Sequence, residues 1–81
     1  MASKDPMLRH LGDFLRKTRE ELGWSQEDLA YESGLHRTYV GAVERGEYNL
    51  TLLTLRKITD ALGISLSDAI GSIPQRKPRR R

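Results

Sequence analysis

The stretch from Gln26 to Gly46 restricts the fold of this chain more than any other part of the sequence. It holds two predicted helical segments, at residues 26–33 and 37–45. Segments of this length do not form stable helices in water by themselves, so both must pack against the rest of the chain. Gly34 lies between them, and glycine enters the left-handed backbone region of a sharp turn at little cost. We therefore predict two short helices that cross at a tight turn.

Apolar residues at helical spacing predict three further helices. The first runs from Met7 to Leu22, and its inward stripe consists of Leu8, Leu11, Leu15 and Leu22. The second follows Thr51, a good helix cap, and its inward stripe consists of Leu52, Leu55, Ile58 and Leu62. The third is short and begins after Ser65. The sequence has no strand pattern, so the prediction is an all-α fold of five helices.

Length and composition limit the chain to one small domain. With 81 residues and no cysteine, it has no disulfide and no thiolate metal site, and its stability must come from helix packing. No apolar run approaches the roughly 20 residues that cross a bilayer. The N-terminal residues also lack the apolar core of a secretory signal. We therefore expect a soluble protein located in the cytoplasm.

Positive charge is concentrated at the C-terminus. The net charge is +3, from 14 basic and 11 acidic residues, and residues 76–81 contain five of the basic ones. Without these five, the chain has a net charge of −2. Residues 74–81 combine two prolines with dense like charge, so we expect a disordered tail. Three roles for it remain open: none at all, a flexible arm that adds phosphate contacts, or a docking segment for another protein.

The polar residues that open the two short helices point to nucleic acid. Gln26 opens the first, and Arg37 and Thr38 open the second. The N–H groups at helix N-termini attract phosphates, so both helix starts can rest on one DNA backbone while the second helix enters the major groove. The alternative is a plain helical hairpin within a small bundle, but bundles favour longer helices with sustained heptads.

The sequence shows no pattern typical of catalysis or metal binding. His10 and His36 lie far apart in the chain and lack evident ligand partners. The adjacent acidic residues at 20–21 and at 27–28 point in different directions on a helix, so they form no carboxylate dyad. We therefore expect no enzyme activity, no cofactor, no metal and no small-molecule ligand.

Residues from about Leu11 to Ile70 resemble the phage-repressor (Cro/C1, or Xre) DNA-binding domain. The resemblance rests on a series of segments in order: LGDFLRKTR, GWSQEDLA, SGLHRTYVGAVERG, NLTLLTLRKI and ALGIS. The run HRTYVGAVERGEYNLT also resembles a narrower group, the controller proteins of restriction-modification systems, which are small stand-alone dimers that regulate genes. The resemblance implies a lambda-repressor-like five-helix domain over residues 8–73, with its helix-turn-helix at 26–45.

The resemblance also implies roles for individual residues. Those at positions that contact bases or phosphates in the family are Gln26, Arg37, Thr38, Tyr39, Ala42, Arg45 and Asn49. Arg19 and Glu44 match a pair that forms a partly buried salt bridge between the first and third helices. Arginine suits bidentate contact with guanine, so Arg37 is the main candidate for base recognition. His36 stands where a serine or threonine cap is usual, and histidine caps helices poorly.

A second copy of the chain is the expected partner. One helix-turn-helix contacts too few base pairs to define a unique site in a genome. The usual solution is a two-fold dimer with half-sites roughly 34 Å apart. Leu53, Ile70 and Ile73 exceed what the core needs, so we expect them in the dimer interface. The predicted function is a homodimeric transcriptional regulator that binds double-stranded DNA sequence-specifically. Two alternatives remain: an antitoxin-like module that also binds a protein, and a nonspecific nucleic-acid binder that uses the basic tail.

Overall fold

The computed structural model describes residues 5–75, which contain five α-helices and no strand. The predicted all-α fold of five helices is thus confirmed. Asp5 caps the first helix by accepting the N–H of Met7 at 2.9 Å, so this helix begins one residue earlier than expected. Residues 76–81, which contain the five basic residues of the expected tail, lie outside the described residues. The helices are α1 (Pro6–Glu21), α2 (Gln26–Ser33), α3 (Arg37–Glu44), α4 (Leu52–Leu62) and α5 (Leu66–Gly71).

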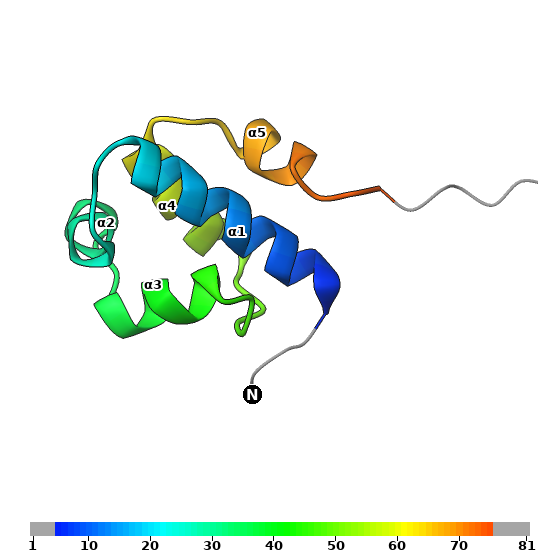
Figure 1. The fold of residues 1–81 in the computed structure, drawn as a ribbon, viewed down its shortest axis with the longest axis horizontal. Helices are drawn as coiled ribbons and strands as arrows, with labels where there is room; N and C mark the ends of the chain where they lie inside the picture. Colours follow the sequence, from blue (N-terminus) through cyan, green and yellow to red (C-terminus); the bar gives the residue numbers. More distant parts are fainter. Residues whose placement is uncertain (1–4, 76–81) are drawn as a thin grey trace, which may run out of the picture.

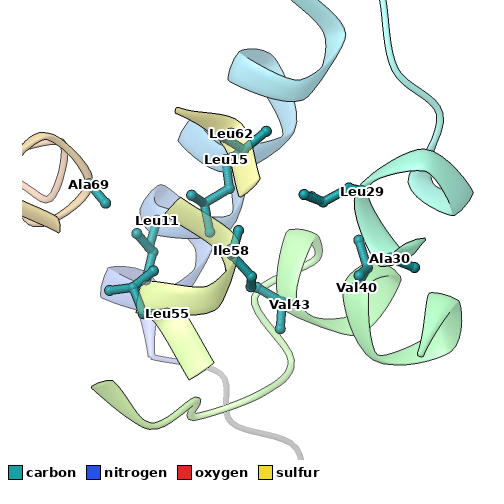
Figure 2. Close-up of a cluster of buried hydrophobic side chains, with 10 residues drawn as sticks. All are labelled: Leu11, Leu15, Leu29, Ala30, Val40, Val43, Leu55, Ile58, Leu62 and Ala69. Carbon is teal, nitrogen blue, oxygen red and sulfur yellow. The ribbon is translucent and has the colours of Figure 1, made fainter. Parts of the chain in front are cut away.

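The helices are arranged around α1, which crosses the molecule between α3 and α5 (Figure 1). α1 packs against α3, α4 and α5, while α2 packs against α3 and α4. Burying a leucine or isoleucine side chain contributes about 1.5–3 kcal/mol, so the core that the helices share is what stabilises the short α2 and α3. This core is aliphatic (Figure 2) and consists of Leu11, Leu15, Leu29, Ala30, Val40, Val43, Leu55, Ile58, Leu62 and Ala69.

Side-chain caps fix the starts of α2, α4 and α5. Ser25 Oγ accepts the N–H of Asp28 at 3.0 Å, and Asp28 Oδ2 accepts the N–H of Ser25 at 2.8 Å, which completes a capping box. The hydroxyl oxygens of Thr51 and Ser65 cap α4 and α5. At the start of α3, His36 makes no cap hydrogen bond, in line with the poor capping ability of histidine.

Gly34 makes the turn between α2 and α3. Its φ is 74°, and the N–H groups of Gly34 and Leu35 donate to the carbonyl oxygens of Tyr31 and Ala30 at 3.3 and 3.0 Å. A Cβ at this position would meet no atom within 4 Å, so glycine is required for its backbone conformation and not for space. The turn sets the direction in which α3 leaves α2.

α1 and α3 approach each other closely at Gly12, a contact that the sequence does not predict. A Cβ on Gly12 would lie 2.4 Å from the carbonyl oxygen of Val43 and 2.6 Å from that of Glu44. Any larger residue would therefore push α3 away from α1. Gly12 fixes the distance between the two helices, and with it the position of the C-terminal half of α3.

Two leucines assigned to the inward stripes lie on the surface instead. Leu22 is 47% exposed and Leu52 is 65% exposed. Leu22 follows the last residue of α1, and Trp24 packs against the core in its place. Leu52 is the first residue of α4 and borders a surface groove. The inward prediction was wrong for both residues, because helical spacing does not tell where the core ends along a helix axis.

Candidate nucleic-acid interface

α3 has one buried face and an exposed leading turn. Val40 and Val43 are 1% and 3% exposed, and they hold the helix against the core. Arg37 and Thr38, its first two residues, are exposed, and Tyr39 is half-buried. The leading turn is therefore accessible to another molecule while the rest of the helix is fixed.

A buried ion pair between Arg19 of α1 and Glu44 of α3 ties these helices together. Arg19 donates from Nε to Glu44 Oε2 at 2.7 Å and from Nη2 to Oε1 at 3.0 Å. Its Nη1 donates to the carbonyl oxygen of Trp24 at 2.7 Å. The hydrogen bonds to Glu44 raise the pKa of Arg19 above its ordinary value, against the opposing effect of burial. The two side chains are 9% and 2% exposed, so each charge is stabilised mainly by the other and not by water.

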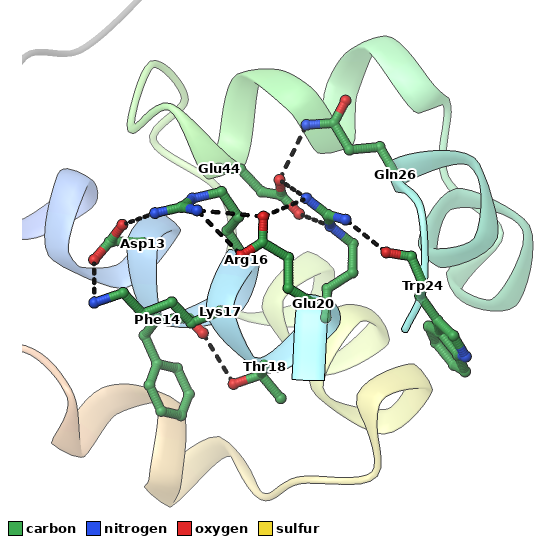
Figure 3. Close-up of polar contacts among 10 residues, drawn as sticks. Asp13, Phe14, Arg16, Lys17, Thr18, Glu20, Trp24, Gln26 and Glu44 are labelled. Atoms are coloured by element: carbon green, nitrogen blue, oxygen red, sulfur yellow. Dashed lines mark hydrogen bonds and ion pairs between the residues drawn. The ribbon is translucent and has the colours of Figure 1, made fainter. Parts of the chain in front are cut away.

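Gln26 links this ion pair to the surface. Its Nε2 donates to Glu44 Oε1 at 3.0 Å (Figure 3). A Cβ on Gly41 would lie 3.4 Å from Gln26 Oε1 and 3.1 Å from Arg45 Nη1, so these two side chains lie together over the backbone of α3. The first residue of α2 therefore braces α3 and lies next to an arginine expected to bind phosphate.

Both arginines expected to contact DNA are paired with carboxylates on the surface. Arg45 donates from Nε and Nη2 to Glu47 at 3.0 and 3.1 Å, and this contact raises the pKa of Arg45. Arg37 Nε lies 3.9 Å from Glu27 Oε2, with both side chains well exposed. Exposed pairs of this kind contribute at most about 1 kcal/mol, so both guanidinium groups can exchange a carboxylate for a phosphate or a base.

Tyr48, whose place the sequence does not predict, lies against Tyr39. The ring centroids are 4.6 Å apart and the ring planes are inclined at 40°. Tyr48 belongs to the loop after α3, whereas Tyr39 belongs to the first turn of α3. The contact therefore joins the loop to the exposed leading turn of the helix.

The remaining residues expected to contact DNA lie further along the chain. Ala42 is half-buried on α3, and Asn49 is exposed in the loop between α3 and α4, where it borders the same surface groove as Leu52. Of the seven expected residues, the structure thus groups three in one contiguous edge and two beside each other over α3. The edge is Arg37, Thr38 and Tyr39, and the neighbours are Gln26 and Arg45.

The groove is partly apolar, and it lies between the start of α1, the start of α4 and the end of α5. It encloses about 830 Å³, and Met7, Leu52 and Ile70 on its rim are 48%, 65% and 43% exposed. Leu53 on α4 is 66% exposed, whereas Ile73 packs partly against the core. Of the residues expected in a dimer interface, Leu53 and Ile70 thus present the most surface.

Among residues 5–75, no three His, Cys, Asp or Glu side chains gather in a way that could hold a metal ion. No helix in this described part of the chain is long and apolar enough to span a membrane.

Comparison with known proteins finds relatives with this sequence pattern and fold. The sequence model of the family described as helix-turn-helix matches residues 15–68. A hypothetical transcription factor from Neisseria meningitidis serogroup B is 49% identical over 51 residues, which cover 63% of this chain and 48% of that protein. Control protein C.SmaI from Serratia marcescens is 50% identical over 56 residues, which cover 69% of this chain and 67% of that protein.

A solved structure extends the similarity to nearly the whole fold. It is the restriction-modification controller protein C.Esp1396I as a tetramer in complex with its natural 35 base-pair operator. The TM-score is 0.77 at 37% sequence identity, and the match covers 84% of this chain and 90% of that chain. The chain therefore belongs to the helix-turn-helix family of the Cro/C1 type, together with the controller proteins of restriction-modification systems.

Proposed function

We propose that this protein is a sequence-specific transcriptional regulator of the controller type, which binds a two-fold DNA operator as a homodimer. The observation that carries the proposal is the exposed leading turn of α3, with Arg37 and Thr38, on a helix whose opposite face is fixed by the core and by Glu44. The related controller bound to its operator supports the same use of the fold. The proposed activity is DNA binding without catalysis, and the proposed location is the cytoplasm.

The proposed domain spans residues 8–73, with the helix-turn-helix at 26–45 and a basic tail at 74–81. Without the five basic residues of the tail the chain has a net charge of −2, so its affinity for DNA must come from a few well-placed groups. We assign contacts with base edges to Arg37, Thr38, Tyr39 and Ala42. We assign contacts with backbone phosphates to Gln26, Arg45 and Asn49.

The proposed homodimer uses the exposed apolar side chains outside the DNA-facing turn. Leu53 and Ile70 are exposed on α4 and α5, and Ile73 lines the same groove as Ile70. A dimer through these residues would give two copies of α3 related by a two-fold axis, which is what a palindromic operator requires. The tetrameric assembly of the related controller on DNA supports association between copies.

The test is to footprint the protein on the DNA upstream of its own gene, and then to measure binding of Arg37→Ala to the protected site and to single-base-pair variants of it. We expect affinity to fall about 5- to 150-fold, equivalent to about 1–3 kcal/mol, with discrimination lost at one base position. Lys17→Ala removes an exposed cation of α1 that is assigned neither to the DNA contacts nor to the dimer interface, and it should bind like the unmodified protein.

Three other outcomes would change the assignment. Equal affinity for the protected site and for random DNA would identify a nonspecific binder. A small protein that copurifies in stoichiometric amount would favour the antitoxin-like alternative. Equal losses for Arg37→Ala on every DNA sequence would make Arg37 a phosphate contact and not a base contact.

A further inference from the structure

We propose that Tyr48 is a positioning residue for DNA recognition: it holds the ring of Tyr39 in one orientation at the edge of α3 and so narrows the set of operator sequences that the protein accepts. The inference rests on the proposed function. It concerns a residue outside the helix-turn-helix, in the loop that follows α3.

The loop is held in place before Tyr48 is reached. Gly46 N–H donates to the carbonyl oxygen of Val43 at 3.0 Å, and Glu47 N–H donates to that of Ala42 at 2.9 Å, a pair of hydrogen bonds that closes the end of the helix. Gly46 has a φ of 75°, and a Cβ on it would lie 2.7 Å from Cα of Arg9. Both the backbone conformation and the contact with α1 therefore fix the direction in which the chain continues toward Tyr48.

The ring of Tyr39 is held from two sides. It packs against the edge of the aliphatic core on one side, and the ring of Tyr48 covers it on another, with the centroids 4.6 Å apart. This separation lies within the range of about 4.5–7 Å that aromatic pairs favour. Tyr48 itself is 40% exposed, so it acts as an outer support that leaves the exposed part of Tyr39 available.

A supported ring discriminates better between base pairs than a mobile one. If Tyr39 turns to suit a different base step, it must give up its contact with Tyr48. Contacts between aromatic rings of this geometry correspond to roughly a three- to tenfold change in an equilibrium constant. Tyr48 therefore penalises the alternative orientations of Tyr39 by about that factor, which appears as discrimination at the base step beside Tyr39.

The experiment begins with the duplex that the unmodified protein selects from a random DNA library. Affinities for this duplex and for every single-base-pair variant of it are measured for the unmodified protein, Tyr48→Ala and Tyr48→Phe. We expect Tyr48→Ala to lower discrimination about three- to tenfold at the positions beside Tyr39 and to leave it unchanged elsewhere. Tyr48→Phe keeps the ring pair and should keep the discrimination. Tyr31→Ala removes a tyrosine that is 84% exposed on α2, and it serves as the matched control.

A second pair of variants shows whether Tyr48 acts through Tyr39. In a Tyr39→Ala background, adding Tyr48→Ala should cause no further loss of discrimination. Thermal unfolding of each variant, followed by circular dichroism, confirms that the binding measurements report on folded protein.

Each contrary result overturns the inference. Unchanged discrimination for Tyr48→Ala means that Tyr48 does not position Tyr39. Equal losses for Tyr48→Phe and Tyr48→Ala on all duplexes make the Tyr48 hydroxyl a phosphate contact. A further loss in the Tyr39→Ala background gives Tyr48 a contact of its own. If the unmodified protein selects no sequence at all, the proposed function fails, and this is a separate outcome from the failure of the Tyr48 inference alone.

Discussion

Replacing Glu44 by alanine should destabilise the fold more than removing any other single ion pair of the described chain. The change leaves the guanidinium of Arg19 buried, with its Nε and one Nη without their carboxylate partners, and it removes the acceptor of Gln26. Breaking a buried pair in this way costs about 3–5 kcal/mol. The Arg19 charge would keep only the carbonyl oxygen of Trp24 and a longer contact of 4.0 Å with Glu20, which replace neither the bidentate carboxylate nor water. A domain of this size is stabilised by only about 4–12 kcal/mol, so a large part of its stability is lost.

The assay is urea and thermal unfolding, followed by helical circular dichroism and by the fluorescence of Trp24. For a domain of this size, each kcal/mol shifts the melting temperature by about 4–8 °C, so a decrease of roughly 12 °C or more is expected. Glu47→Ala is the matched control: it also removes a glutamate that pairs bidentately with an arginine, but both side chains are exposed. That variant should lose at most about 1 kcal/mol.

A compensating variant separates charge burial from simple loss of contact. Arg19→Met combined with Glu44→Leu removes both charges and keeps an apolar contact between α1 and α3, so it should recover most of the stability lost in Glu44→Ala. The reasoning is refuted if Glu44→Ala loses less than about 1 kcal/mol, or if the double variant is no more stable than Glu44→Ala. Either result would mean that the ion pair is solvated in a way that its low exposure does not indicate.

The remaining predictions concern packing, charge and assembly. Gly12→Ala should lower the unfolding free energy by about 2 kcal/mol or more, since the new methyl group would overlap backbone of α3, whereas Gly71→Ala, which meets no atom within 4 Å, should be neutral or slightly stabilising in the same denaturation assay. Hydrogen bonds from neighbouring cations lower the pKa of Asp13 below its ordinary 3.8, so its stabilising contribution is present above about pH 4 and disappears as the pH falls through the lowered value. Asp13→Asn should therefore lower the melting temperature slightly at pH 7 and make progressively less difference below pH 4; an equal difference at all pH values would contradict this. Leu53→Glu together with Ile70→Glu should shift the protein from dimer to monomer in light scattering, and a monomeric unmodified protein at high micromolar concentration would remove the basis for the dimer proposal.

The order and bounds of the helices could be predicted from local sequence, because their determinants lie within a few residues of each boundary. Ser25 with Asp28 and the hydroxyl of Thr51 mark helix starts, and Gly34 marks a helix end. The α3 helix was predicted to begin at Arg37, and it does. Most inward positions were predicted correctly, and the two wrong ones are Leu22, just after the last residue of α1, and Leu52, the first residue of α4.

The contacts between distant parts of the chain could not be predicted from spacing. Gly12 sits inside a helical pattern, where an isolated glycine suggests a close contact but does not name its partner, and only the fold brings it to Val43. The pairing of Tyr39 with Tyr48 depends on how the chain leaves α3. A tyrosine two residues after the glycine that ends the helix was a visible feature of the sequence, but nothing local gives the direction of its ring.

α3 has one face buried in the core and an exposed leading turn, and this division affects how DNA specificity can change among related proteins. Arg37 and Thr38 lie outside the core. If they contact DNA as proposed, exchanging them should alter the recognised DNA while the scaffold keeps its stability. Tyr39 is different, because its ring is shared between the core edge and Tyr48. New operator preferences can therefore arise at positions 37 and 38 by single substitutions, whereas positions 39 and 48 should change together. Among related regulators, the residue at position 39 is then expected to covary with a residue that lies beyond the helix-turn-helix itself.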